Sequence, residues 1–130
     1  ETEISEDGKT HRGSIEIEPD GQGWYSLGPG SYEVIMEGEI TIGPEEAGWV
    51  ITRSTLNRNG IFLTSGLYDS GYKGVMAGVI HITGNQLTKT RIKKGTRIGQ
   101  FLLFKAEAVK TYDGDYGTGK YDDGAYGVPV

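Results

Sequence analysis

Short stretches of the chain alternate between apolar and polar residues, and glycine-containing turns separate these stretches. The segment 14–18 (SIEIE) has a period of two, which is typical of a short half-buried strand. The segment 32–42 also places apolar residues on one face, and Gly38 predicts a kink that divides it into two strands. Brief apolar runs follow at 49–51 and 61–63, and the segment 98–104 predicts a final strand.

The segment 73–83 predicts a longer strand than any of these. One of its faces carries Val75, Ala77 and Val79, and the opposite face is also apolar. A strand that is apolar on both faces is buried on both sides, either within its own chain or against a second subunit. The sequence leaves both alternatives open.

Glycine accounts for 22 of the 130 residues, well above its typical share of roughly 7%. Glycine is a poor helix former and favours turns with positive φ, so many short segments joined by such turns predict an all-β domain. No helix is expected beyond a turn or two in 104–110. We expect residues 1–110 to form the β domain and residues 111–130, rich in Gly, Tyr and Asp, to form a flexible tail.

Charge and composition exclude several classes of function. The chain has 13 Lys and Arg against 18 Asp and Glu, a net charge of −5 that argues against a nucleic-acid partner. No apolar run approaches the roughly 20 residues that cross a bilayer, so no membrane partner is expected. Cysteine is absent, which excludes disulfides, thiolate metal sites and thiol catalysis. No signal segment opens the chain, and we expect a cytoplasmic location.

Two segments carry residue types suited to anion and hydroxyl chemistry. Arg53, Ser54, Thr55 and Arg58 lie close together in sequence, and guanidinium groups pair well with phosphate oxygens. A solvated basic loop is the alternative interpretation. Asp69 lies in a glycine-rich turn just before the predicted long strand, where a carboxylate can be fixed and aimed. An ordinary β-turn aspartate is the alternative there.

Two further segments are weaker candidates. Gln100 follows the segment 89–97, which has a local charge of +5 and no acid, and its amide can contact a phosphate. A strand-entry turn explains this segment equally well. Tyr112, Lys120 and Tyr121 lie on the glycine-rich tail, which can close over a ligand and exclude water. Plain disorder is the alternative for the tail.

Taken in order, these segments resemble motifs of the trimeric dUTPase and dCTP deaminase superfamily. The segment 27–32 (LGPGSY) resembles the family's Leu-x-Pro-Gly-Glu-Phe, and 53–60 (RSTLNRNG) resembles its Arg-Ser-Ser-Leu-Ala-Arg-x-Gly. The segment 66–74 (GLYDSGYKG) resembles Gly-x-Ile-Asp-x-x-Tyr-x-Gly, and 94–100 (KGTRIGQ) resembles Gly-x-x-Ile-Gly-Gln. With the tail included, the resemblance covers about residues 27–123. It implies a distorted, jelly-roll-like β-barrel that assembles as a homotrimer.

The resemblance also implies roles for the candidate residues. Asp69 binds the deoxyribose 3′-hydroxyl and orients or deprotonates the attacking water, and Tyr72 stacks on the deoxyribose. Mg²⁺ is held mainly by the nucleotide's triphosphate rather than by a protein metal site. Base recognition falls largely to backbone groups of the hairpin after Asp69. The remaining substrate-binding residues, which contact the phosphates or close over them, are Arg53, Ser54, Thr55, Arg58, Gln100, Tyr112, Lys120 and Tyr121.

The function implied in this way is a dUTP diphosphatase that converts a deoxyuridine nucleotide, dUTP, to dUMP and pyrophosphate. In deaminases a catalytic Glu stands at the position of Val79, and valine cannot shuttle a proton, so dCTP deamination is disfavoured. The alternative is a catalytically inactive trimer with a structural or regulatory role. It is motivated by Val79, by acidic residues at 122–123 where phosphates are expected, and by the lack of the family's Ser-x-Asp-Leu segment in 1–26.

Overall fold

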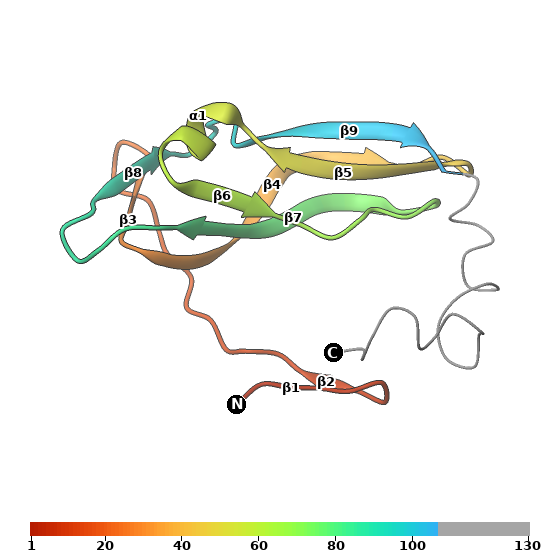
Figure 1. Cartoon of the computed structure of the whole chain (residues 1–130), viewed down its shortest axis with the longest axis horizontal. Coiled ribbons are helices and arrows are strands. Elements are labelled where there is room, and N and C mark those ends of the chain that lie inside the picture. Colours follow the sequence, from red (N-terminus) through yellow and green to blue (C-terminus); the bar gives the residue numbers. More distant parts are fainter. Residues whose placement is uncertain (107–130) are drawn as a thin grey trace.

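Strands make up nearly all the regular structure of the computed structural model, which describes residues 1–106 (Figure 1). The strands are β1 (Glu3–Ile4), β2 (Lys9–Thr10), β3 (Trp24–Leu27), β4 (Gly30–Thr41), β5 (Glu46–Thr52), β6 (Ile61–Thr64), β7 (Lys73–Ile82), β8 (Thr90–Lys93) and β9 (Gly99–Lys105). One short helix, α1 (Ser54–Arg58), joins β5 to β6. The prediction of an all-β fold is confirmed.

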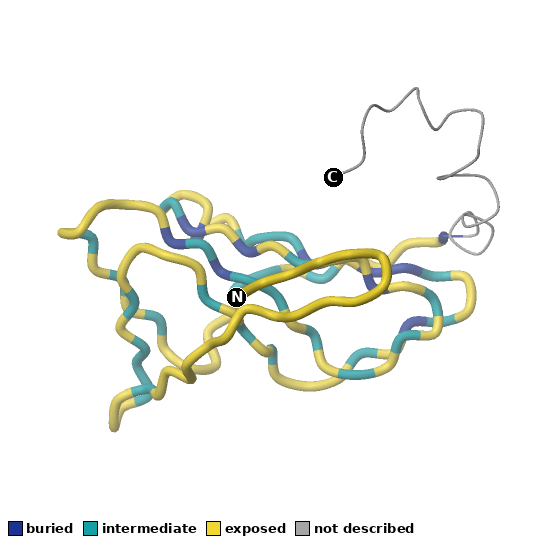
Figure 2. The backbone as a smooth tube through the Cα atoms, turned by 90° about the horizontal axis from the view of Figure 1, so that it is seen from below, coloured by how far each residue is buried: buried dark blue, intermediate teal, exposed yellow. Residues whose placement is uncertain are grey.

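The strands pair antiparallel in a three-stranded sheet of order β4-β7-β6 and in the two-stranded sheets β5-β9, β3-β8 and β1-β2. The core lies where the first two sheets face each other, and Figure 2 shows the buried positions along these strands. Its buried residues include Val50 of β5, Leu63 of β6 and Ile80 of β7. Apolar side chains from alternate positions of several strands thus meet in one core.

The predicted kink in the segment 32–42 is confirmed as a bulge within β4, but the predicted division into two strands is wrong, because β4 continues through the bulge. The pairing of β4 with β7 shifts register between Ile35 and Glu39. Gly38 lies in this interval with φ +82°, a conformation that glycine adopts without a steric penalty. A bulge of this kind bends the strand and increases its twist, which helps a sheet to curve around a core.

β7 is buried on one face only within this chain. Ile80 and Ile82 belong to the core, whereas Val75 on the opposite face is 44% exposed. Two neighbours of β7 add apolar surface beside it, Ile35 of β4 at 70% exposure and Phe62 of β6 at 42%. The chain therefore buries only one face of this strand by itself. A second subunit over the other face stays a prediction.

Two further sequence predictions of secondary structure were wrong. The segment 14–18 is not a strand, because no other strand of residues 1–106 pairs with it, and Ile15 is 90% exposed. It belongs to an exposed arm that leads away from the sheets (Figures 1 and 2). α1 was not expected, because five residues with one buried position, Leu56, are too few to show a helical period. No helix in the described residues is long and apolar enough to span a membrane.

Thr52, the last residue of β5, connects the two sheets through its side chain. Its hydroxyl donates to the carbonyl oxygen of Leu63 at 3.0 Å and accepts from the Leu63 amide at 2.9 Å. A hydroxyl can do both because it carries one donor and two lone pairs. This pair of bonds fixes the end of β5 against β6 just before the chain enters α1.

We expect Thr52→Val to lower the free energy of unfolding by about 1–3 kcal/mol, because it leaves both backbone groups of Leu63 without their part-buried partner. Chemical denaturation monitored by tryptophan fluorescence measures this change. Thr41→Val, at an exposed position of β4, is the matched control and should stay within about 0.5 kcal/mol of the parent. Equal stability of the two variants would contradict the bridging role of Thr52.

Candidate functional site

Arg53 lies where β5 ends and α1 begins. Its backbone amide donates to the carbonyl oxygen of Ile98 at 2.9 Å, and its guanidinium Nη1 donates to the carbonyl oxygen of Arg97 at 3.1 Å. The start of the helix is therefore tied to the segment that leads into β9. Buried Leu56 anchors α1 in the core, and Ser54, Thr55 and Arg58 are exposed.

Gln100 lies beside this helix because β9 pairs with the end of β5. In the register of the two strands, Gln100 is opposite Ile51, and Gly99 is opposite Thr52. The structure therefore brings five of the predicted site residues to one end of the β5-β9 sheet. We call this group the anion cluster; its members are Arg53, Ser54, Thr55, Arg58 and Gln100. Its guanidinium, hydroxyl and amide groups are donors suited to phosphate oxygens.

Asp69 opens a tight turn that is held at several points. The Tyr72 amide donates to the Asp69 carbonyl oxygen at 3.1 Å, and Gly71 has φ +88°, which is the geometry of a type II turn. The Gly71 amide and the Tyr72 carbonyl bond to the backbone of Ile42 at 3.0 and 2.8 Å. The Ser70 hydroxyl donates to a carbonyl oxygen of β5 at 2.6 Å. The backbone around Asp69 is thus fixed to β4 and β5.

The Asp69 carboxylate itself is exposed and has no hydrogen bond or ion pair within residues 1–106. It is therefore available to accept a hydrogen bond from a water molecule or a ligand hydroxyl. The half-buried ring of Tyr72 lies 5.1 Å from the ring of Tyr68, and its hydroxyl donates to the Val75 carbonyl oxygen. The turn thus presents an exposed carboxylate and, three residues later, a fixed aromatic ring. The roles of Asp69 and Tyr72 stay predictions.

The anion cluster and the Asp69 turn lie at opposite ends of β5 within one chain (Figure 1). Gly48 pairs with Tyr68, which precedes Asp69, whereas Arg53 follows the far end of β5. The five residue steps from 48 to 53 correspond to about 17 Å of strand. A single chain therefore does not bring Asp69 and the phosphate-binding candidates together.

Three predicted site residues of the tail, Tyr112, Lys120 and Tyr121, lie outside the described residues. Within residues 1–106, no group of three or more His, Asp or Glu side chains is placed to hold a metal ion. Sequence analysis did not single out Tyr68, although tyrosine there departs from the isoleucine of the motif that it otherwise resembles. That departure was the available signal.

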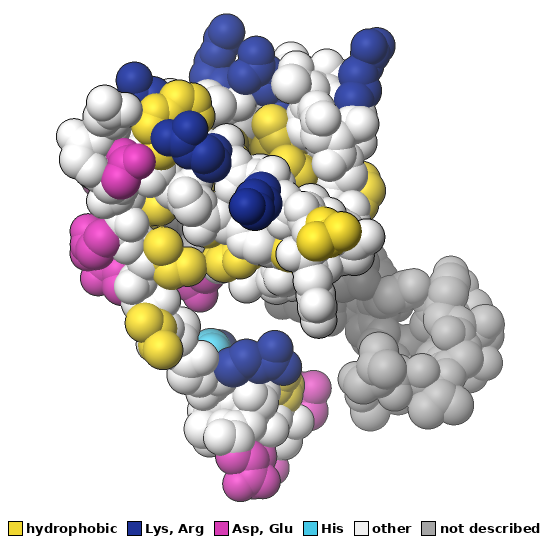
Figure 3. Space-filling model, turned by 90° about the vertical axis from the view of Figure 1, so that its left-hand side faces the viewer, with side chains coloured by type: hydrophobic (Ala, Val, Ile, Leu, Met, Phe, Trp, Pro, Cys, Tyr) yellow, Lys and Arg dark blue, Asp and Glu magenta, His cyan; other side chains and the backbone are white. Residues whose placement is uncertain are grey.

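The basic segment 89–97 includes β8, which pairs with β3. Figure 3 shows Lys and Arg side chains gathered over this end of the molecule. Trp24 lies opposite Lys93 in the β3-β8 register, and its ring is 4.6 Å from the guanidinium carbon of Arg91 and 5.8 Å from the Lys93 Nζ. These cation–π contacts give part of the basic charge a packing role within the sheet.

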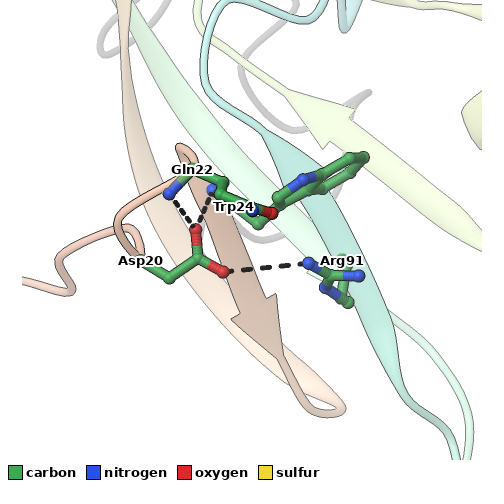
Figure 4. A network of polar contacts seen from close by, with 4 residues as sticks. All are labelled: Asp20, Gln22, Trp24 and Arg91. Carbon is green, nitrogen blue, oxygen red and sulfur yellow. Dashed lines mark hydrogen bonds and ion pairs between the residues drawn. The ribbon is translucent and has the colours of Figure 1, made fainter.

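Asp20 orders the turn that leads into β3 (Figure 4). One of its carboxylate oxygens accepts hydrogen bonds from the amides of Trp24 and Gln22, both at 2.9 Å. These two bonds lower the pKa of the Asp20 carboxyl below its usual value of 3.8, with a smaller contribution from the charge of Arg91. The ion pair with Arg91, at 3.8 Å and half exposed, adds little by comparison.

Comparison with known proteins finds the same resemblance over most of the chain. A family model described as dCTP deaminase-like matches residues 6–106. The "probable deoxyuridine 5′-triphosphate nucleotidohydrolase" of Halobacterium salinarum is 34% identical over 91 residues, which cover 70% of this chain and 53% of that protein. The protein of that name from Methanosarcina barkeri is 33% identical over 112 residues, covering 85% of this chain and 61% of the relative.

The solved structure of native EIAV dUTPase is similar in fold, with a TM-score of 0.57 and 18% sequence identity. The match covers 71% of this chain and 73% of the EIAV chain. The two curated relatives are longer proteins, and the matched region spans 53% and 61% of their lengths. These findings support the expected β-barrel-like architecture.

The lowered pKa of Asp20 predicts a pH-dependent contribution to stability. A carboxyl whose pKa is lower in the folded state stabilises the fold above its unfolded value of 3.8, and this contribution is lost as the pH falls through the folded value. We therefore expect Asp20→Ala to have a lower Tm than the parent at about pH 7, and the difference to shrink toward about pH 3.

Thermal unfolding followed by circular dichroism measures this difference. Asp7→Ala, in the exposed arm, is the control and should match the parent at both pH values. A Tm difference for Asp20→Ala that stays constant with pH would contradict the role assigned to the carboxylate charge.

Proposed function

Because this chain belongs to the dCTP deaminase-like family, we propose that it is a dUTP diphosphatase, which hydrolyses dUTP to dUMP and pyrophosphate. The observation that carries the proposal is the unengaged carboxylate of Asp69, held in the same fixed turn as Tyr72. The names of the curated relatives support the choice of substrate. Free deoxynucleotides are the substrate, so the proposal includes a cytoplasmic location.

Asp69 acts as the general base in this proposal. Its carboxylate accepts a proton from water as the water attacks the α-phosphorus, and the bond from that phosphorus to the pyrophosphate oxygen breaks. The rigid backbone of the turn supports this role, because general-base catalysis needs a carboxylate within hydrogen-bond reach of the attacking water. Tyr72 offers its ring to the deoxyribose, and the same Asp69 carboxylate accepts a hydrogen bond from the 3′-hydroxyl.

The anion cluster binds the triphosphate. Arg53 and Ser54 follow the end of β5, and Gln100 of the neighbouring strand adds an amide donor. Such donors stabilise charge that develops on phosphate oxygens during the displacement. Mg²⁺ is the proposed cofactor, and in this proposal the triphosphate supplies most of its ligands, as the family resemblance implies. When bound, Mg²⁺ neutralises phosphate charge.

A homotrimer completes the site. The separation of about 17 Å along β5 keeps Asp69 away from the anion cluster of its own chain. We place the Asp69 turn of one copy against the anion cluster of another copy. The exposed apolar face of β7, with Val75, Ile35 and Phe62, supports association because water-exposed apolar surface of this kind favours a partner. Tyr112, Lys120 and Tyr121 of the tail close over the bound nucleotide.

Deamination is not part of the proposal. Val79 lies in β7 opposite Glu33 of β4 and Thr64 of β6, and its side chain has no group that can transfer a proton. Val79 itself therefore supplies no acid or base for the exchange of an amino group.

We expect Asp69→Asn to lower kcat for dUTP by a factor on the order of 10²–10⁴, because the amide cannot serve as a base. Release of pyrophosphate in the presence of Mg²⁺ measures the rate. Asp7→Asn, on the distant arm, should retain the parent rate. A parent protein that releases no pyrophosphate from dUTP would overturn the proposed activity.

Thermal unfolding with added nucleotide then separates a binding protein from an inactive scaffold. Ligand at 100 times its Kd stabilises a protein by about 2.7 kcal/mol. No shift with dUTP, dCTP or dTTP would favour the alternative of a structural or regulatory trimer.

The shared site predicts complementation between two inactive variants. A D69N chain keeps the anion cluster, and an S54A/Q100A chain keeps Asp69. After the two are mixed, unfolded and refolded together at equal amounts, about a quarter of the sites should combine intact groups from both copies. We expect activity near that fraction of the parent, measured by pyrophosphate release.

The control is the same mixture made from separately refolded variants, which should stay inactive while the trimers do not exchange. Light scattering on the parent should give the mass of three chains. A monomer, or a mixture without recovered activity, would contradict a site formed between copies.

A further inference from the structure

The hydroxyl of Tyr68 bonds to both backbone groups of one residue in β7. It accepts from the Ala77 amide at 2.9 Å and donates to the Ala77 carbonyl oxygen at 2.9 Å. Tyr68 is only 9% exposed, whereas Ala77 is exposed, and both bonds are part-buried. A phenol can make both bonds because its oxygen is at once a donor and an acceptor.

This hydroxyl replaces a missing strand residue. β6 ends at Thr64, which is paired with Val79 of β7. Backbone groups of alternate strand residues point to the same side, so those of Ala77 point along the line of β6 beyond its last residue. The chain leaves the sheet after Thr64, and the side chain of Tyr68 occupies the position where the next residue of β6 would pair with Ala77. Without it, the amide and carbonyl of Ala77 would have no partner on this side.

Tyr68 is also tied to β5 through its backbone. Its amide donates to the Gly48 carbonyl oxygen at 2.8 Å, and the Gly48 amide donates to the Tyr68 carbonyl oxygen at 2.9 Å. Its ring lies 5.1 Å from that of Tyr72 and 6.4 Å from that of Phe101. One residue therefore joins β5, β7 and β9, and it immediately precedes Asp69.

We propose that Tyr68 is a positioning residue, whose hydroxyl fixes β7 against the turn that carries Asp69 and Tyr72. The effect on catalysis rests on the proposed dUTP diphosphatase activity. The motif that this segment resembles has isoleucine here, which offers packing but no hydrogen bond. This chain therefore uses two hydrogen bonds to hold the turn where packing alone would leave the backbone of Ala77 unpaired.

Tyr68→Phe tests the proposal because it keeps the ring and removes only the hydroxyl. We expect kcat for dUTP to fall about tenfold with KM changed less than about twofold, since a misplaced carboxylate weakens the transition state more than it weakens binding. The pH profile of kcat should keep its shape. Tyr32→Phe is the matched control: it also removes a phenol bond to a backbone carbonyl, that of Gly28, and should leave kcat within about twofold.

An unchanged kcat for Tyr68→Phe would overturn the proposal. A lower KM would also overturn it, because it would mean that the hydroxyl occupies a position that the nucleotide takes. Both variants are assayed below their Tm, so that lost activity is not lost folding.

Amide hydrogen exchange on the full chain gives a second measurement that does not depend on activity. In Tyr68→Phe, the amides of Ala77 and Tyr72 should exchange on the order of tenfold faster than in the parent. The Arg53 amide, bonded to Ile98 at the far end of β5, is the internal reference and should not change. Unchanged exchange at Tyr72 would overturn the link from the hydroxyl to the turn. If the parent protein does not hydrolyse dUTP, the proposed function fails, and exchange at Tyr72 still decides whether Tyr68 fixes the turn.

Discussion

The length and rigidity of β5 constrain everything that this fold can do. At one end Gly48 exchanges backbone hydrogen bonds with Tyr68, and at the other Thr52 bonds to Leu63 and leads into Arg53. The strand cannot shorten without losing its pairing with β9, so the carboxylate turn and the anion cluster stay apart in each chain. The proposed division of the site between copies rests on this strand geometry.

The high glycine content, which predicted turns, has a second cause in the packing of this strand pair. A Cβ at Gly48 would lie 2.2 Å from the Cζ of Phe101. A Cβ at Gly99 would lie 2.7 Å from the carbonyl oxygen of Ile51. Neither glycine has positive φ, so at these two positions glycine allows close packing within the β5-β9 pair rather than a turn conformation. Composition alone could not distinguish these two uses.

The sequence predicted local features well where one chain segment determines them. The all-β class, the bulge at Gly38 and the turn at Asp69 all follow from residue types within a few positions of each other. The sequence did not predict α1, because the start of this helix is stabilised by the bond from the Arg53 amide to the carbonyl oxygen of Ile98, which is distant in sequence. The strand predicted at 14–18 failed for the converse reason, since alternation specifies a strand only when another strand accepts its backbone bonds.

The candidate site likewise has features that the sequence predicts and features that depend on how distant segments pair. The order of the motifs predicted that Arg53, Ser54 and Gln100 act together on the phosphates. The register of β5 and β9 brings these three residues to one end of that sheet. The role proposed for Tyr68 depends on where β6 stops relative to β7, which is a property of the sheet. The departure from the motif's isoleucine marks the position but does not reveal what its hydroxyl bonds.

The open apolar face of β7 has a consequence for how such a protein behaves as it is diluted. Under the proposed association, copies that bury this face against one another exist in a concentration-dependent equilibrium with single chains. If the anion cluster of one copy serves the carboxylate of another, specific activity is not a constant of the polypeptide. It declines when the cell makes too little of the chain, so expression level itself becomes a control on turnover.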